Sequence, residues 1–298
     1  MKINDLKYFN YLSQTKSFTK AAQYFHISQP TISLAIKRLE KELQTKLIKR
    51  KRPTGVFKIT ETGQILFNSS KEIIKNEDLT KKEIQQFNSK KIRLGLPPII
   101  SQLYFPLILD NLIKNHLINK LNVDENGSQQ LLSDLLTSKI DIALIASPLT
   151  FHNLNLSTIP LVSRNFKIIA SKDHWLKSYS SIPFSALKNE NFISFTKQFI
   201  HLKVLSLYSK QAGFTPKVIF KTQSVSLLKK LIQKNAGISL LVGDVVKKKD
   251  YLKIVNIKNS LPEKFNISIA MRRNYILNYN EQAFITELFK LKSKIKQT

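Results

Sequence analysis

The stretch SQPTISLAIKRLEKEL, residues 28–43, decides how the rest of the chain is interpreted. It begins with a serine, a glutamine and a proline, and a proline early in a helix costs little because the first N–H groups lack an acceptor within the helix. Its apolar side chains fall on one side of the predicted helix: Ile32, Ala35, Ile36, Leu39 and Leu43. A helix with small polar residues at its N-terminus and cations in later turns fits a DNA major groove. A surface helix with a solvated basic face fits these residues equally well, so the neighbouring segments must decide.

Two short helices are predicted before this stretch. Residues 3–14 carry apolar side chains at helical spacing, and Ser17 is a predicted N-cap for the second helix. The adjacent Ala21 and Ala22 allow another helix to approach closely. Residues 26–28 form the turn into the third helix. Three short helices, the last two joined by a tight turn, predict a helix-turn-helix unit.

The segment after the third helix predicts a basic hairpin, or wing. Residues 47–60 contain two short β-type runs that flank a turn with Pro53 and Gly55. Residues 49–52 are four consecutive cations, which suit a phosphate backbone or a minor groove. An ordinary surface hairpin is the alternative, and the cations directly after a basic helix disfavour it.

A longer helix is predicted from Thr60, its N-cap, with Gly63 in its first turn. Apolar residues recur at multiples of seven along it, at Leu66, Ile73 and Phe87, and Ile84 lies on the same side. This interrupted heptad pattern predicts a linker helix over residues 61–90 whose seam pairs with a second copy of the chain. Residues 88–91 are the predicted hinge to the next domain.

Residues 91–298 alternate between predicted strands and helices. The strands are expected over residues 92–96, 120–123, 141–146, 166–171, 192–195, 218–220, 238–242 and 265–271. The helices are expected over residues 101–117, 128–138, 200–212, 224–235 and 280–296. Such alternation predicts parallel sheets with crossover helices, and the length favours two α/β lobes over one. Lobe I is expected at about 91–162 plus 266–298, and lobe II at about 163–265.

The net charge of +28 indicates affinity for polyanions but does not locate a binding surface. Residues 1–90 hold 18 Lys and Arg against 8 Asp and Glu, and residues 91–298 hold 30 against 12. The cations are spread, and 41 of the 48 are lysines. Three of the few arginines, Arg38, Arg50 and Arg52, fall together near the N-terminus and mark the expected DNA-binding segment.

Composition argues against several other functions. The chain has no cysteine, so a disulfide, a thiolate metal site and a cysteine nucleophile are excluded. Its five histidines lack metal-ligand spacing, and no glycine-rich phosphate-binding motif occurs. The N-terminus has no apolar run typical of a signal peptide. We therefore expect a cytoplasmic protein that is not an enzyme and that has neither a cofactor nor a metal.

Taken together, these motifs resemble the LysR-type transcriptional regulators. The likeness covers essentially the full chain and is strongest at residues 17–22 (SFTKAA), 28–33 (SQPTIS), 36–40 (IKRLE), 47–50 (LIKR) and 60–63 (TETG). It is weaker at residues 125–128 (ENGS), 135–145 and 235–238 (NAGI). Ile48 replaces an aromatic residue that is usual in the family, while Asn235 and the pair Ser138-Lys139 stand where glycine is common. These departures leave the ligand open.

The resemblance implies a multidomain α+β and α/β architecture. A winged helix-turn-helix DNA-binding domain would span residues 1–60, and a dimerising linker helix would span 61–90. Residues 91–298 would form a two-lobed effector domain similar to periplasmic binding proteins. The implied partners are double-stranded promoter DNA, a second copy in a homodimer or homotetramer, and a small-molecule effector, with RNA polymerase as a further candidate.

The resemblance also implies which residues contact DNA. The expected base-reading set follows the start of the third helix: Gln29, Pro30, Thr31 and Ser33. Ser28, just before them, belongs to the expected DNA-binding set as a residue that can cap the helix or contact an external acceptor. The expected contacts with phosphate or the minor groove are Lys37, Arg38, Arg50 and Arg52. The chemistry agrees, because glutamine can bond adenine bidentately and the apolar parts of proline and threonine suit thymine methyl groups.

Candidate effector-binding residues follow predicted strand ends: Pro98, Ser101, Gln102, Ser128, Ser147, Thr196 and Thr222. Ser101 and Ser128 are expected to open helices, where backbone N–H groups favour an anion such as a carboxylate. Each serine is equally well explained as a simple N-cap. The expected effector is a small anionic metabolite, and a malolactic-type activator that senses a small dicarboxylate is one suggested subgroup.

Two other functions explain part of the chain. A free-standing solute-binding protein would account for residues 92–298 but not for residues 1–60. A basic architectural DNA-binding protein would account for the charge but not for the α/β lobes. A regulator that binds both DNA and a small ligand accounts for all of these segments.

Overall fold

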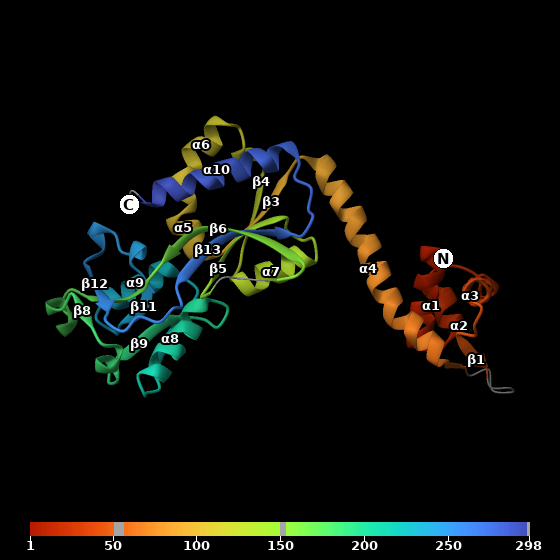
Figure 1. Ribbon diagram of the computed structural model, residues 1–298, viewed down its shortest axis with the longest axis horizontal. Coiled ribbons are helices and arrows are strands. Elements are labelled where there is room, and N and C mark those ends of the chain that lie inside the picture. The colour runs from red at the N-terminus through yellow and green to blue at the C-terminus, as the bar shows by residue number, and fades with distance from the viewer. Residues whose placement is uncertain (51–56, 150–152, 297–298) are drawn as a thin grey trace. The chain divides into compact units, whose positions relative to one another are not determined.

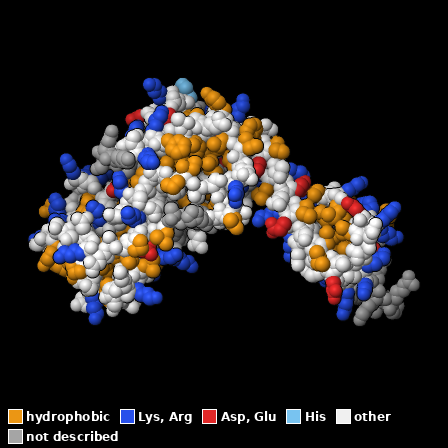
Figure 2. All heavy atoms as spheres, in the orientation of Figure 1, with side chains coloured by type: hydrophobic (Ala, Val, Ile, Leu, Met, Phe, Trp, Pro, Cys, Tyr) orange, Lys and Arg blue, Asp and Glu red, His pale blue; other side chains and the backbone are white. Residues whose placement is uncertain are grey.

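A computed structural model describes residues 1–50, 57–149 and 153–296 (Figure 1). The chain forms two compact units, Met1–Gln85 and Gln86–Thr298. In the space-filling view, lysine and arginine side chains are scattered over both units, and acidic side chains are few (Figure 2). The broad spread of cations expected from the sequence is therefore visible on the surface.

The first unit is built from three helices, a hairpin and the first part of a long helix. Its elements are α1 (Ile3–Thr15), α2 (Phe18–Tyr24), α3 (Gln29–Glu42), β1 (Ile48–Arg50), β2 (Phe57–Ile59) and α4 (Glu61–Ser89). The predicted three helices and the antiparallel pairing of the hairpin are confirmed. The predicted turn of the wing, which includes Arg52, lies outside the described residues.

One apolar core holds the first unit together. Phe9 of α1 and Ile32 and Leu39 of α3 have no exposed surface, and Ala21 of α2 is equally buried. The small side chains of α2 thus permit the close helix approach that the sequence predicted. Leu66 of α4 and Phe57 of β2 also belong to this core, so β2 and the start of α4 are fixed to the helices.

The second unit contains a five-stranded sheet with the order β4-β3-β5-β13-β6. Its strands are β3 (Ile92–Leu96), β4 (Leu121–Glu125), β5 (Ile142–Ser147), β6 (Leu156–Arg164) and β13 (Phe265–Arg272). Strands β4 and β5 run parallel to β3, but β13 runs antiparallel to both β5 and β6. The predicted parallel pairing is therefore confirmed for β4, β3 and β5, and β13 departs from it. Strand β6 was missed because Pro160 and polar residues interrupt its apolar alternation.

Two smaller sheets form the rest of the second unit. The four-stranded sheet has the order β11-β7-β12-β8, and β7 is antiparallel to both of its neighbours. Its strands are β7 (Phe166–Ser171), β8 (Ser181–Ile182), β11 (Ser239–Val242) and β12 (Leu252–Ile257). The strands β9 (Asn191–Phe195) and β10 (Lys217–Thr222) pair in parallel, and Phe192 bridges to Ile238 beside β11. All of these strands lie between β6 and β13 in sequence.

Helices cover both faces of the five-stranded sheet (Figure 1). The helices of this unit are α5 (Pro98–Leu103), α6 (Leu109–Lys114), α7 (Ser128–Leu136), α8 (Ile200–Gln211), α9 (Val225–Gln233) and α10 (Tyr279–Lys296). Short 3-10 turns are η1 (Phe105–Ile108), η2 (Ile118–Lys120), η3 (Trp175–Ser178), η4 (Phe184–Leu187), η5 (Gly243–Val245) and η6 (Lys248–Asp250). Strand β5 is buried along its whole length. Its Ala143 and Ile145 pack with α7, and its Ile142 and Leu144 face the core on the other side.

A buried carboxylate ties three strands of this sheet together. Asp141 is fully buried just before β5. Arg93 of β3 donates to both of its oxygens, at 2.7 and 2.8 Å, and Arg272 of β13 donates to Oδ1 at 2.8 Å. Arg272 also donates to the carbonyl oxygens of Leu135 and Ile140. The charge of Asp141 is thus compensated by two arginines that are distant in sequence.

Candidate DNA-binding surface and effector site

The start of α3 presents polar groups to solvent because its cap is made locally. The Ser28 hydroxyl accepts a hydrogen bond from the backbone N–H of Thr31 at 3.3 Å and lies 2.8 Å from the Thr31 hydroxyl. This is the N-cap arrangement that serine favours. Gln29 and Pro30 are exposed in the first turn, and none of the described residues hydrogen-bonds the Gln29 amide. Of the predicted base-reading set, Thr31 and Ser33 are half-buried.

The opposite face of α3 lies in the core, as the spacing predicted. Ile32, Ala35, Ile36 and Leu39 are buried, while Lys37 is exposed on the polar side. Leu43 was expected on the apolar side, but it is the C-cap and its surface is 37% exposed. The core therefore fixes which face of α3 is free to meet a partner.

Arg38 has a structural partner that the sequence analysis did not foresee. Its Nε and Nη2 donate to the two carboxylate oxygens of Asp5 at 2.9 and 2.6 Å. Asp5 is 3% exposed on α1, and its hydrogen bond with Arg38 raises the pKa of the guanidinium. The pair joins α1 to α3, so part of the Arg38 guanidinium serves the fold. The predicted phosphate contact of Arg38 stays a prediction.

The hairpin places two lysines opposite each other. Lys49 of β1 and Lys58 of β2 are register partners, and both are exposed. Like charges directly opposite in an antiparallel pair repel, and a bound polyanion would relieve that repulsion. Lys58 was not among the predicted DNA-contacting residues. Its position in a β-type run, two residues before Thr60, could have indicated that it lies on the hairpin. The side chains of Arg50 and Arg52 lie outside the described parts of the structure.

The motif TETG fixes the hairpin and the start of α4. The Thr60 hydroxyl donates to the carbonyl oxygen of Lys46 at 2.6 Å and accepts from the Gly63 N–H at 2.9 Å. A Cβ at Gly63 would overlap the carbonyl oxygen of Leu47 and the side chain of Ile59. Only glycine allows this approach, which explains why Gly63 stands in the first turn of a helix.

The predicted dimer seam mixes residues with different surroundings. Leu66 is 7% exposed and packs inside the first unit, and Ile73 is half-buried against the same core. Leu66 is therefore a core residue, which corrects the prediction for this position. Phe87 and Ile84, by contrast, are 46% and 59% exposed on α4. These two apolar side chains, three residues apart, are the part of the seam that remains on the surface.

Most of the predicted effector residues make hydrogen bonds within the fold. Ser101 lies inside α5 and donates to the carbonyl oxygen of Pro98 and to Glu125. Ser128 is the first residue of α7 and its N-cap is Gly127, so neither serine caps a helix as predicted. The buried Ser128 hydroxyl instead accepts from the Ala146 N–H at 2.9 Å.

Three further predicted residues with hydroxyl groups lie at or directly after strand ends. Among the described residues, two of these hydroxyls hydrogen-bond within the fold, and one does not. The Ser147 hydroxyl donates to the Leu149 carbonyl oxygen at 2.7 Å, and the Thr222 hydroxyl accepts from the Ser224 N–H at 3.0 Å. The Thr196 backbone N–H donates to the carbonyl oxygen of Thr222. The Thr196 hydroxyl, however, is buried and has no hydrogen-bond partner among the described residues. Thr196 thus retains an unused polar group.

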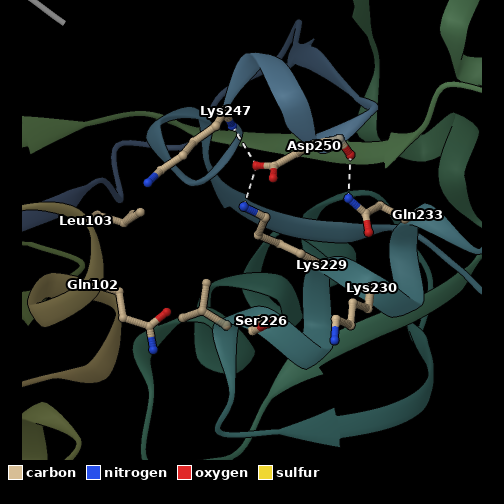
Figure 3. A pocket seen from close by; sticks show the side chains of 9 residues that line it. Gln102, Leu103, Ser226, Lys229, Lys230, Gln233, Lys247 and Asp250 are labelled. Atoms are coloured by element: carbon tan, nitrogen blue, oxygen red, sulfur yellow. Dashed lines mark hydrogen bonds and ion pairs between the residues drawn. The ribbon is translucent and has the colours of Figure 1, made fainter.

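A cavity of about 240 Å³ lies between α5 on one side and α9 with η6 on the other (Figure 3). Its lining is mainly polar and basic: Gln102, Leu103, Val225, Ser226, Lys229, Lys230, Gln233, Lys247 and Asp250. Gln102 alone was in the predicted effector set. The lysines were missed because nothing in the sequence brings residues 226–250 next to residue 102. The four-residue spacing of Lys229 and Gln233, which places both on one face of a helix, could have indicated a polar surface there.

A polar cluster joins the C-cap residue of α5, Tyr104, to η5. The Tyr104 hydroxyl donates to Asp244 Oδ2 at 2.9 Å, and Arg164 Nε donates to the same oxygen at 2.8 Å. Burial and the nearby Asp244 carboxylate both raise the pKa of Tyr104, so its hydroxyl stays protonated and donates. Arg164 is the last residue of β6, so the cluster lies where the chain leaves the five-stranded sheet.

The structure contains no metal-binding cluster of three or more His, Asp or Glu within its described residues. His201 is buried among Phe166, Phe195 and Phe265, and burial lowers its pKa to about 3. A neutral histidine in an aromatic core serves packing. In the described parts of the chain, no helix is both long and apolar enough to cross a membrane.

Comparisons with known proteins agree with this arrangement. Residues 3–64 match the family described as "Bacterial regulatory helix-turn-helix protein, lysR family", and residues 85–291 match "LysR substrate binding domain". The chain is 34% identical to the malolactic fermentation system transcriptional activator of Lactococcus lactis subsp. lactis (strain IL1403), over 98% of this chain and 99% of that protein. It is 29% identical to the uncharacterised HTH-type transcriptional regulator YwbI of Bacillus subtilis (strain 168), over 96% and 95%.

Solved structures share the fold at low sequence identity. The LysR family regulator HinK from Pseudomonas aeruginosa has a TM-score of 0.57 at 20% identity, covering 99% of each chain. Full-length BenM has a TM-score of 0.54 at 21% identity, covering 99% of this chain and 96% of that one. Fold, motifs and matched domains define a transcriptional regulator with a DNA-binding helix-turn-helix and an effector-binding domain. This class of protein is a regulator and not an enzyme. The chain belongs to the LysR family.

Proposed function

We propose that this regulator reads promoter DNA with the first turn of α3, as a homodimer or homotetramer, in the cytoplasm. The observation that carries the proposal is the exposed Gln29 amide, which no described residue hydrogen-bonds. An unpaired amide at the end of a helix can form two hydrogen bonds with an adenine edge. The cap made by Ser28 holds the turn in place without using that amide.

The proposed contacts with the DNA backbone surround this turn. Lys37 is exposed on α3, and Lys49 and Lys58 are exposed on the hairpin. Contacts of this kind position a protein on DNA and add affinity without sequence preference. Arg50 and Arg52 stay in the proposed set from the sequence alone.

The test compares Gln29→Ala with the parent protein. Genome-wide footprinting of the purified full chain first identifies a bound promoter. Fluorescence anisotropy then gives the affinity ratio between this site and random DNA. We expect Gln29→Ala to lose about 1–3 kcal/mol of that discrimination, because one bidentate base contact disappears. Gln64→Ala is the control, since Gln64 is exposed on α4 and bonds only Asn68 among the described residues. An unchanged ratio in Gln29→Ala would contradict the base-reading role.

Exposed apolar surface supports the proposed self-association. Ile84 and Phe87 lie on α4 within one helical turn of each other. In the second unit, β4 and β10 are edge strands that expose Val123 at 41%, and Ile219 and Phe220 at 46% and 42%. Apolar edge strands are natural pairing surfaces, and a second copy of the chain would cover them.

We further propose that the effector is a small anionic metabolite. The support is the basic cavity between α5 and α9, together with the relative named for malolactic fermentation, a term that points to small carboxylic acids. The predicted set of Pro98, Ser101, Ser128, Ser147, Thr196 and Thr222 remains a second candidate location. Within it, the buried Thr196 hydroxyl is free among the described residues to bond a ligand. RNA polymerase stays a candidate partner on the strength of the family alone.

A further inference from the structure

We propose that the cavity between α5 and α9 is a binding site for a small dianion, a dicarboxylate or a phosphate, and that Lys230 and Lys247 recognise its double charge. The proposal deepens the proposed function and rests on it for the regulatory consequence, namely that the bound dianion is the effector. The cavity lies away from most of the residues that the sequence suggested for the effector, because it shares only Gln102 with them.

The charge of the lining favours a ligand with two negative charges. Lys229 pairs with Asp250 and also donates to the Val245 carbonyl oxygen at 3.2 Å. Lys230 and Lys247 are exposed and have no carboxylate within ion-pair distance among the described residues. Three lysines and one aspartate leave two formal positive charges at the cavity. A dianion would neutralise them, whereas a monoanion would leave one uncompensated.

Asp250 directs a ligand toward those two lysines. Burial alone would raise the pKa of its carboxyl, but the hydrogen bonds from Lys229 and from the Lys247 N–H outweigh burial and lower the pKa. Asp250 therefore stays ionised and repels an anion from the part of the cavity where Lys229 is already neutralised. In Figure 3, Lys247 lies above the cavity, Gln102 of α5 and Ser226 of α9 lie below it, and Lys230 lies on the far side of Lys229 from Lys247.

The neutral groups and the size of the cavity restrict the ligand further. The Gln102 amide and the Ser226 hydroxyl are exposed at the cavity and can both donate hydrogen bonds to an oxyanion. A volume of about 240 Å³ is below the roughly 300–1,000 Å³ typical of sites for drug-sized ligands. A compound of a few carbon atoms, or inorganic phosphate, fits this space.

A bound dianion would act on the contact that joins α5 to η5. Gln102 lies two residues before Tyr104, and Lys247 lies three residues after Asp244. Tyr104 donates to Asp244, and neither of these two residues lines the cavity. A ligand held by both Gln102 and Lys247 would therefore bridge the same two chain segments that this contact joins. This provides a physical route from binding to a change in the effector domain.

The test measures binding of four probes to the full chain by isothermal titration calorimetry: succinate, malate, inorganic phosphate and acetate. We expect at least one dianion to bind about tenfold more tightly than acetate, because only a dianion satisfies both free lysines. Succinate and malate against phosphate distinguish a dicarboxylate site from a phosphate site, and either result supports the proposal. Lys230→Gln and Lys247→Gln should each weaken that dianion about fivefold, and the double variant more than tenfold.

Matched controls exist on the same elements. Lys234 follows α9 and Lys248 lies in η6, yet neither lines the cavity, so Lys234→Gln and Lys248→Gln should bind the dianion as the parent does. Equal binding by the parent and the double variant would overturn the proposal, as would no binding of any of the three dianions. A loss of binding in Thr196→Val with full binding in the double variant would also overturn it and would place the ligand at the predicted cleft. If one of these results is seen while every variant keeps the DNA footprint of the parent, the dianion proposal fails and the proposed DNA-binding function stands.

Discussion

The two units of this protein carry their functional residues in different ways. In the first unit, the proposed DNA-reading residues and the cap that presents them lie within one turn of α3, from Ser28 to Thr31. In the second unit, the proposed anion site joins Gln102 to Lys247, which are far apart in the chain. A contiguous site is visible in the sequence, whereas a site assembled from distant segments depends on the sheet topology. The largest predicted effects should therefore come from the contacts that assemble the second unit.

Asp141→Ala should give the largest loss of stability. The substitution leaves Arg93 and Arg272 without their shared carboxylate, and removing one partner of a buried ion pair costs about 3–5 kcal/mol. Trp175 is the only tryptophan and belongs to the second unit, so its fluorescence during urea unfolding reports this unit. The control is Asp124→Ala, because Asp124 is exposed and pairs with an exposed lysine. If Asp141→Ala unfolds at the same urea concentration as the parent, the arginine cluster does not hold the sheet.

Glu281→Gln should give the next largest effect, seen as a changed pH dependence. Burial raises the pKa of Glu281 from 4.5 to about 7, although Asn278 N–H and the Tyr275 hydroxyl donate to its carboxylate. Between these two values the native state keeps a proton that the unfolded state has lost. Relative to Glu281→Gln, the parent should therefore lose roughly 3 kcal/mol of unfolding free energy as pH rises from about 4.5 to about 7, while the buried neutral His201 contributes an opposite rise that both proteins share.

The measurement for Glu281 is again unfolding followed by Trp175 fluorescence, now across this pH range. Glu281→Gln should remove the Glu281 contribution to the slope, and Glu72→Gln, an exposed change on α4, should keep it. The same pH dependence of stability in the parent and in Glu281→Gln would show that Glu281 is ionised in the folded state across that range.

Gly63→Ala should have a smaller effect, confined to the first unit. The new methyl group would overlap the Leu47 carbonyl oxygen, and overpacking of this kind costs about 1–3 kcal/mol. We expect weaker DNA binding with unchanged Trp175 fluorescence unfolding. In Gly243→Ala, the nearest neighbour of a Cβ is the flexible Lys167 side chain at 3.4 Å, so this control should leave DNA binding intact. Equal DNA affinity in Gly63→Ala and the parent would show that the hairpin can shift without consequence.

Sequence reasoning succeeded where local chemistry determines the structure. The Ser28 cap, the apolar face of α3 and the Thr60–Gly63 turn all follow from residues within four positions of one another. It was wrong about Ser128, because a serine in the first turn resembles a cap, while its hydroxyl instead bonds Ala146 of the neighbouring strand. It was also wrong about Leu66, since a heptad position cannot reveal that the helix end packs into its own unit.

The cavity illustrates what the sequence could not supply. Lys229 and Lys230 are two lysines among 41, and only their place in the lining of the cavity between α5 and α9 distinguishes them from Lys234. The structure also changed the interpretation of Arg38, because its guanidinium hydrogen-bonds Asp5, which is 33 positions away in the sequence. Residue type was therefore a sound guide to possible chemistry, and three-dimensional contacts decided which groups remain available for a ligand.

The central claim is that DNA sequence is read in the first unit and a small dianion is bound in the second. The most direct measurement is footprinting of the bound promoter, with and without the dianion that calorimetry selects, for the parent, Gln29→Ala and the Lys230→Gln/Lys247→Gln double variant. We predict that Gln29→Ala loses its preference for the site and that the double variant keeps the site but loses the response to the dianion. Retained preference in Gln29→Ala, or a full response in the double variant, would contradict the account.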